Sequence, residues 1–177
     1  MLLKSLFFIL YMIDFKTVWQ DLQEKDSFQT FCKERGDYYL AHGFLQLTPQ
    51  GTPSKPWQIG LYSPEKDDLA LFTAPDFQLH HDKAFKDGGI IQQLTFSDSF
   101  LSTESVYERI QTFLSQEYSH EAVQTTLLIL QVIDQTPVYN CTVVTQSFKM
   151  ITLHFDVFSG EILHKNISSV LDLKATD

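Results

Sequence analysis

Hydrophobic and polar positions follow a helical period and then a strand period, twice along this chain. In the first pass, apolar residues recur at i, i+3, i+4 and i+7 and predict a helical stripe made of Phe15, Val18, Trp19 and Leu22. Asp14 is the predicted N-cap. The next apolar residues would fall on the opposite face of a straight helix, so the pattern predicts a kink or two short helices before Gly36, which marks the C-terminus. Apolar runs then predict strands over residues 38–48, 57–62 and 69–73.

The second pass begins at Ser102 or Ser105, either of which can cap a helix. The apolar stripe of this helix consists of Val106, Ile110, Phe113 and Leu114. Four segments follow and predict an antiparallel sheet over residues 125–133, 138–145, 149–157 and 161–164. The first of these is a nearly continuous apolar run, which is typical of a strand covered on both faces.

The two passes together predict an α+β fold made of two similar units, each with a helix packed on an antiparallel sheet. The first unit covers residues 14–74, the second covers residues 102–177, and residues 75–101 form a linker. The units match in pattern rather than in residue identity, so we interpret them as a degenerate tandem repeat.

Composition and charge exclude some functions. A chain of 177 residues is long enough for one domain, or for two small ones packed together. Its formal net charge of −9 is not interrupted by a basic cluster. We therefore predict no nucleic-acid partner, because affinity for nucleic acid comes largely from Lys and Arg neutralising phosphates. The same charge disfavours an anionic membrane surface, and the oligomeric state stays open.

Residues 1–13 form an apolar segment that fits three interpretations. Lys4 and the apolar run after it are typical of a secretion signal or anchor, but no small-x-small cleavage site follows. The run is shorter than the roughly 20 residues that span a bilayer. The segment is otherwise a buried extension, or lies upstream of a translation start at Met12. A signal would place the protein in the cell envelope or outside the cell; without one, the cytoplasm is favoured.

Two cysteines, Cys32 and Cys141, stand far apart in the sequence and make no metal-binding spacing. The favoured interpretation is that both are small apolar residues in the core. A disulfide between them is the alternative, because pairing depends on a distance that the sequence does not give.

Residues 155–163 combine a strand, a Ser-Gly turn and the start of a return strand. Gly160 can supply a positive φ in this turn, and Asp156 can accept hydrogen bonds from turn amides. With Glu161, these residues resemble the closing hairpin of the PepSY domain family, in which a strand ends in Asp-x-x-small-Gly-Glu. The resemblance covers residues 103–165, whereas the first unit has Ser-Pro-Glu-Lys-Asp at residues 63–67 instead. It implies non-catalytic binding or inhibition, as in peptidase propeptides and cell-envelope proteins, and it carries over no catalytic residue.

The remaining polar candidates are few. His80, His81 and Asp82 form a cluster of potential metal ligands, but adjacent histidines in an extended chain point to opposite sides. A solvated loop is therefore favoured over a metal site, and no cofactor is predicted. His154 and Asp156 share a strand face, where they form either an acid–base pair or ordinary surface.

Three aromatic residues, Trp57, Tyr62 and Phe72, either line a ligand groove or pack in the core. The sequence contains no nucleophile elbow, phosphate loop, dinucleotide fingerprint or zinc-protease motif. We therefore expect a non-catalytic binding or regulatory module that engages a peptide, a peptidase or another protein through a sheet edge or groove. The alternative is a small-molecule binder with an apolar pocket between helix and sheet. A hydrolytic or metal-dependent enzyme is the third hypothesis.

Overall fold

The computed structural model describes residues 14–84 and 90–169, so the predicted apolar segment 1–13 lies outside it. The described helices are α2 (Phe15–Gln23), α3 (Asp26–Glu34) and α4 (Thr103–Glu117). The described strands are β1 (Tyr39–Leu47), β2 (Pro53–Ser63), β3 (Asp68–Thr73), β4 (Gln78–Lys83), β5 (Val123–Ile133), β6 (Thr136–Thr145), β7 (Lys149–Asp156) and β8 (Ile162–Ser169). The chain is therefore a mixed α+β fold.

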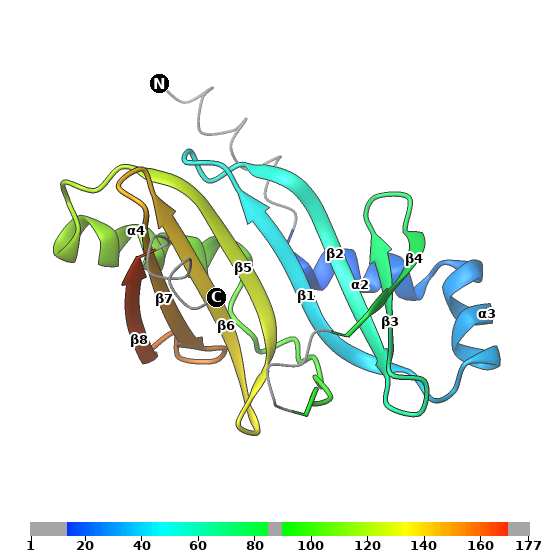
Figure 1. Cartoon of the computed structure of the whole chain (residues 1–177). Coiled ribbons are helices and arrows are strands. Elements are labelled where there is room, and N and C mark those ends of the chain that lie inside the picture. The colour runs from blue at the N-terminus through cyan, green and yellow to red at the C-terminus, as the bar shows by residue number, and fades with distance from the viewer. Residues whose placement is uncertain (1–13, 85–89, 170–177) are drawn as a thin grey trace.

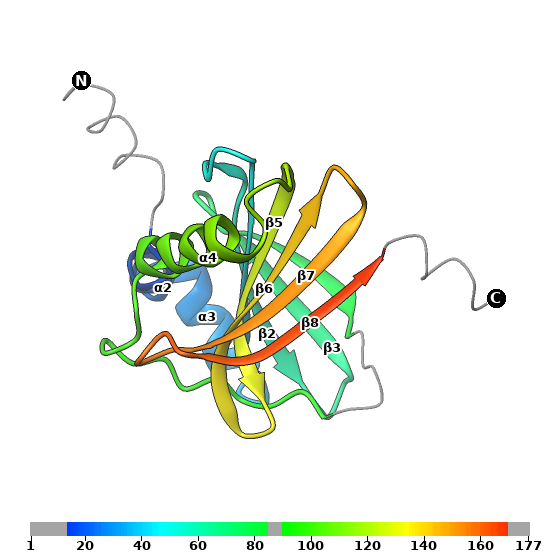
Figure 2. The same cartoon turned by 90° about the vertical axis from the view of Figure 1, so that its left-hand side faces the viewer.

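The strands form one antiparallel sheet of eight strands, in the order β4-β3-β2-β1-β5-β6-β7-β8. Each strand pairs with its neighbour in sequence, except at the centre, where β1 pairs with β5. The three helices lie on one side of this twisted sheet (Figures 1 and 2). We call the side without helices the open face.

One hydrophobic core fills the space between the helices and the sheet. It contains the stripe predicted for α2, where Phe15, Val18 and Leu22 are buried, together with residues from both halves of the chain. The ring of Phe15 lies directly on Gly43 of β1, because a Cβ added there would meet the ring at 2.3 Å. The predicted break after α2 is also confirmed: α3 turns a second stripe, Phe28 and Phe31, onto the core.

The N-termini of α2 and α4 cap each other. Asp14 stands at the N-cap position of α2, as predicted, but its side chain makes no hydrogen bond to its own helix. Instead, its carboxylate accepts hydrogen bonds of 2.8 Å from both the backbone N–H and the hydroxyl of Thr103. The Thr103 hydroxyl in turn accepts a bond from the N–H of Phe15 at 3.4 Å. Ser102 is the N-cap of α4, and Ser105 donates its N–H to it.

The turn between β7 and β8 has the conformation that the sequence predicted. Asp156 accepts hydrogen bonds from the N–H groups of Phe158 and Ser159, and Gly160 has φ +70°. The carbonyl of Glu161 accepts a bond from the N–H of Asp156 and closes the turn. The Arg109 side chain lies against Gly160, and a Cβ there would meet it at 2.3 Å.

Several expectations from the sequence are wrong. The predicted linker contains β4, which pairs with β3 along its whole length, so His80, His81 and Asp82 lie on an edge strand rather than in a loop. Cys32 is exposed and Cys141 is buried, and both are free, so only Cys141 is a core residue. The predicted end of the helix at Gly36 is confirmed, since this residue directly follows Arg35, the C-cap of α3. None of the described helices has the length and apolar character needed to cross a membrane.

Candidate functional site

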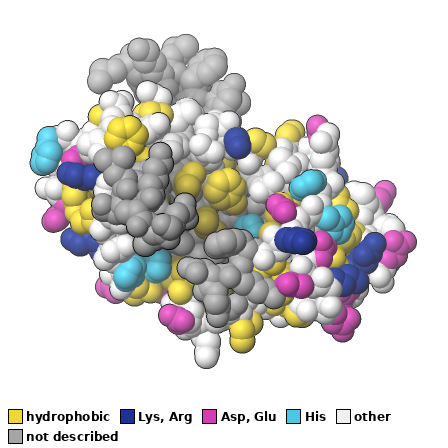
Figure 3. All heavy atoms as spheres, viewed as in Figure 1, with side chains coloured by type: hydrophobic (Ala, Val, Ile, Leu, Met, Phe, Trp, Pro, Cys, Tyr) yellow, Lys and Arg dark blue, Asp and Glu magenta, His cyan; other side chains and the backbone are white. Residues whose placement is uncertain are grey.

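The open face carries a row of side chains that crosses all eight strands. Strand pairing sets them side by side in the order Gln78, Thr73, Gln58, Phe44, Ile129, Asn140, His154 and His164. Side chains alternate between the two faces of a strand, so this row lies opposite the core. Its middle is apolar and its two ends are polar. Hydrophobic side chains also gather near the middle of this face in Figure 3.

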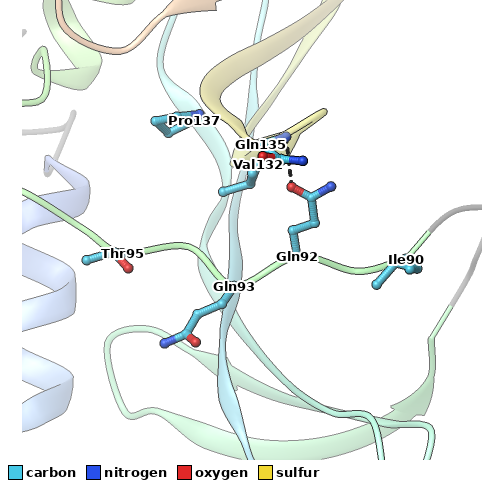
Figure 4. Close-up of a pocket in the computed structure, with 7 residues that line it drawn as sticks. All are labelled: Ile90, Gln92, Gln93, Thr95, Val132, Gln135 and Pro137. Carbon is cyan, nitrogen blue, oxygen red and sulfur yellow. Dashed lines mark hydrogen bonds between the residues drawn. The ribbon is translucent and has the colours of Figure 1, made fainter.

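The segment of residues 90–95 runs past the start of β1, and we call it the strap. Its residues Ile90 to Gln92 border the open face, whereas Leu94 is buried in the core. Three hydrogen bonds fix the strap. The Tyr39 hydroxyl donates to the carbonyl of Ile91 at 2.7 Å, and the N–H of Leu94 donates to the carbonyl of Leu40 at 2.8 Å. The N–H of Gln135 donates to the Gln92 side chain at 2.9 Å (Figure 4). The strap is therefore held to both halves of the sheet.

The turn between β5 and β6 positions Gln135 for its contact with the strap. Asp134 and Gln135 have φ of +48° and +65°, as in the two-residue hairpin turns that match the strand twist. In Figure 4, Gln92 points from the strap toward this turn. Residues of the strap and of the β5–β6 hairpin, Gln92 and Gln135 among them, line a hollow of about 570 Å³.

Between the strap and the row lies a hollow of about 730 Å³, which we call the strap groove. Its apolar side chains include Phe44 and Ile129 at the centre of the sheet. Its polar side chains include three amides and an imidazole, those of Gln58, Gln131, Asn140 and His42. Asp134 is the one acidic residue among the described residues that line it. The groove therefore offers hydrogen bonds and apolar surface with little charge.

The imidazole of His42 packs closely against Gly60 of β2 in the groove. His42 pairs with Gly60, and a Cβ at that glycine would meet the imidazole at 2.3 Å. Burial lowers the pKa of His42 to about 4, because it disfavours the charged form. The ring is therefore neutral at physiological pH, with one nitrogen that donates and one that accepts.

Asn140 is the most unusual polar group in the groove. Its amide oxygen is buried and has no hydrogen-bond partner among the described residues. It stands between Ile129 of β5 and His154 of β7. Leaving a buried acceptor without a partner costs roughly 1–3 kcal/mol. A half-turn of the amide plane exchanges the oxygen and the nitrogen, so the group can present either one to the groove.

The aromatic residues predicted from the sequence lie elsewhere. Trp57 and Phe72 point into the core: the ring of Trp57 packs edge-on against Phe15 at 5.2 Å. Trp57 also borders a smaller hollow of about 260 Å³ beside the proline-rich turn. Tyr62 lies on the open face but is 3% exposed, with its ring against Tyr39 and its hydroxyl donating to Asp67 at 2.8 Å.

His154 and Asp156 share the open face of β7, as the alternation predicted, but they are not brought together as an acid–base pair. Asp156 is engaged by the turn amides, which lower the pKa of its carboxyl. His154 instead lies against His164 of β8, with ring centres 4.8 Å apart. Burial and then the neighbouring His164 lower the pKa of His154.

The potential metal ligands on β4 lie on opposite faces of the sheet and do not form one site. His81 makes a 2.6 Å contact with the carboxylate of Asp68, whereas His80 pairs with Leu71 on the other face of the sheet. The described residues contain no group of three histidine, cysteine or acidic side chains placed to hold a metal ion.

Comparisons with known proteins give a fold but no family. No family model matches the sequence, and no curated protein matches it. A crystal structure of a protein described as a "putative lipoprotein" from Clostridium difficile 630 is similar to this chain, with a TM-score of 0.51 and 9% sequence identity. The match covers 89% of this chain and 95% of that one. At such low identity it shows a shared fold alone.

Proposed function

We propose that this protein is a non-catalytic binding module, and that the strap groove receives a segment of a peptide or protein partner. The observation that carries the proposal is the groove itself, about 730 Å³ bounded by a strap that three hydrogen bonds fix in place. Its lining combines the apolar centre of the sheet with uncharged hydrogen-bonding groups. Such a surface suits an uncharged, partly apolar segment better than a strongly charged one.

We further propose that the two halves of the chain are a degenerate tandem repeat. Each half has a helical segment followed by four consecutive antiparallel strands, and the first strands of the two halves, β1 and β5, pair at the centre. The proposed repeat explains why the groove lies there, since the strap connects one half to the other. The resemblance of the second half to PepSY domains supports a non-catalytic role, with a peptidase among the candidate partners.

Selection from a random displayed peptide library tests the binding proposal. The full chain is compared with Ile129→Arg, which places a charge in the groove, and with Gln111→Arg, which adds the same charge on the exposed side of α4. We expect selected peptides to bind the wild type and Gln111→Arg alike, and to lose at least about tenfold in affinity for Ile129→Arg, because burying an unpaired charge is unfavourable. Circular dichroism verifies that both variants fold.

Selection that enriches no sequence, or peptides that bind Ile129→Arg as tightly as the wild type, would contradict the groove as the binding site. The same three proteins are also assayed as inhibitors of a panel of peptidases, since the PepSY resemblance makes peptidases candidate partners. Inhibition that Ile129→Arg abolishes and Gln111→Arg retains would identify the partner as a peptidase.

A small-molecule ligand is the second candidate, because the volume of the groove falls in the range of about 300–1,000 Å³ that is usual for such sites. The groove lies on the open face, not between helix and sheet as the sequence suggested, because the core fills that space. Thermal-shift screening of uncharged compounds against the same three proteins separates this candidate from the first. A compound that stabilises the wild type but not Ile129→Arg, in the absence of any peptide binder, would favour it.

A further inference from the structure

The central part of the open-face row has the arrangement needed to receive a peptide backbone. Amide side chains stand at both ends of this part, Gln58 on β2 and Asn140 on β6. Two apolar side chains, Phe44 and Ile129, stand between them. Adjacent strands are about 4.8 Å apart, so the two amides are separated by three strand spacings, roughly 14 Å. An extended peptide covers that distance in about four residues.

The strap shows how an extended segment lies on this face. Its residues Ile90 to Gln93 are uncharged and extended, and the carbonyl of Ile91 accepts a hydrogen bond from a side chain of the sheet, that of Tyr39. A second peptide beside the strap would meet Asn140 and Gln58 in the same manner. Each of these amides can donate to a carbonyl and accept from an N–H, which is the complement of a peptide group.

We propose that the strap groove binds an uncharged, extended peptide segment of about four residues, with its backbone on the amides of Gln58 and Asn140 and an apolar side chain on Phe44 and Ile129. Asn140 is the anchor, because its oxygen is buried without a partner among the described residues, and a half-turn of the amide turns that oxygen toward a peptide N–H in the groove. This inference rests on the proposed function and specifies the ligand.

The groove also selects against charge. His42 is uncharged at neutral pH, Gln131 and Asn140 are neutral, and the one acidic residue in the described lining, Asp134, is at its border in the β5–β6 turn. A charged side chain seated at Phe44 or Ile129 would lose its hydration without gaining an ion pair. The ligand segment is therefore uncharged where it meets the sheet centre.

The probe for this proposal is the blocked peptide N-acetyl-Ala-Leu-Ile-Ala-amide, added to the full chain and followed by two-dimensional NMR. Two matched probes carry Asp or Lys in place of Leu, and a third has an ester in place of the central amide, so that it lacks one N–H donor. We expect shifts of the amide signals of Phe44 and Ile129 and of the side-chain amide of Asn140. Each matched probe should bind about tenfold more weakly than the parent peptide, or worse.

Two variants test Asn140 directly. Asn140→Leu removes the amide and should weaken the parent peptide about tenfold while leaving the protein at least as stable, because it also removes an unpartnered buried oxygen. Asn140→Asp keeps an acceptor oxygen but loses the N–H donor, and should weaken binding less than Asn140→Leu does. Thr142→Val, on the same face of β6 but outside the groove lining, is the control and should leave affinity unchanged.

The outcomes separate this inference from the proposed function. If the tetrapeptide binds Asn140→Leu as tightly as the wild type, or if the ester probe binds as tightly as the tetrapeptide, Asn140 is not the anchor. The proposal of a binding module then still stands. If library peptides bind the groove and the tetrapeptide does not, the four-residue mode is wrong. If neither binds, both proposals fail.

Discussion

Two polar side chains in the strap groove, His42 and Asn140, are partly buried at a cost in stability: for His42 the cost appears below about pH 6.5, and for Asn140 it is an oxygen without a partner. His42 is kept neutral by burial, and the oxygen of Asn140 lacks a partner among the described residues. An apolar side chain at either position would avoid these costs. Glycine at position 60 of β2 makes room for the imidazole. The cost is therefore built into the local sequence, and under the proposed function it belongs to a binding surface rather than to a core.

The pKa of His42 predicts how stability depends on pH. The unfolded chain takes up a proton near pH 6.5, whereas the folded protein does so near pH 4. Between these values the unfolded state binds more protons, so stability falls as pH falls from 6.5 to 4 and is unaffected by this group above that window. The loss amounts to at most about 3 kcal/mol.

Urea unfolding at a series of pH values, for the wild type and for His42→Gln, measures this effect. The variant should lose less stability than the wild type across the window, because glutamine does not titrate. The pKa of His154 is also lowered and contributes a slope of the same sign, so the difference between the two proteins is the quantity to compare. Equal slopes would show that His42 is solvated in solution.

At the scale of elements, the contact between the N-termini of α2 and α4 joins the two halves of the chain on the helical side. Asp14 and Thr103 are 89 residues apart in sequence and share hydrogen bonds of 2.8 Å. We expect Asp14→Ala and Thr103→Val each to lower the free energy of unfolding by about 1–2 kcal/mol, since each removes a cap or a buried hydrogen bond. A double-mutant cycle should give a coupling of about 1 kcal/mol.

Ser102→Ala is the matched control for that cycle. It removes the cap that Ser105 uses within α4, and it leaves the bonds to Asp14 intact. Its effect should add to that of Asp14→Ala with little coupling. If the Asp14 and Thr103 variants were equally additive, the two helices would not depend on each other.

The elements with strong periodicity could be predicted from the sequence, and those defined by pairing could not. The stripes of α2, α3 and α4 and the two hairpins follow from local spacing, which is the signal that short-range packing leaves in a sequence. β4 was missed because all of its residues are exposed, so no alternation marks it. The partner of Asp14 was missed because it lies in the other half of the chain.

The groove was missed for a related reason. Phe44, Ile129 and Asn140 come together only through the register of β1, β5 and β6, which the sequence does not state. One signal was available, since the run from residue 125 to 133 is apolar at positions that face both sides of the sheet. On the open face those positions form the centre of the groove. By contrast, the turn at Asp156 and Gly160 was predicted, because a tight turn is specified by its own residues.

At the scale of the whole molecule, the two halves share one sheet and one core. β1 and β5 pair through six residues each, and the hydrophobic cluster contains residues from α2, α4 and strands of both halves. Separating the halves would expose an unpaired central strand and cut this cluster. The strap and the contact between helix N-termini add links on opposite sides of the sheet. We therefore expect the chain to unfold as a single cooperative unit.

The two tryptophans, Trp19 and Trp57, both lie in the first half, so their fluorescence reports on that half, whereas circular dichroism reports on all strands and helices. Ile151→Val, in the fully buried centre of β7, should lower stability by about 1 kcal/mol and Tm by about 2–4 °C. The fluorescence midpoint should fall by the same amount, although the nearest tryptophan belongs to the other half. Ile59→Val in β2, equally buried, is the matched change in the first half. If Ile151→Val shifted the dichroism and left the fluorescence midpoint in place, the halves would be separate folding units, and the strap would be a tether rather than one wall of a shared site.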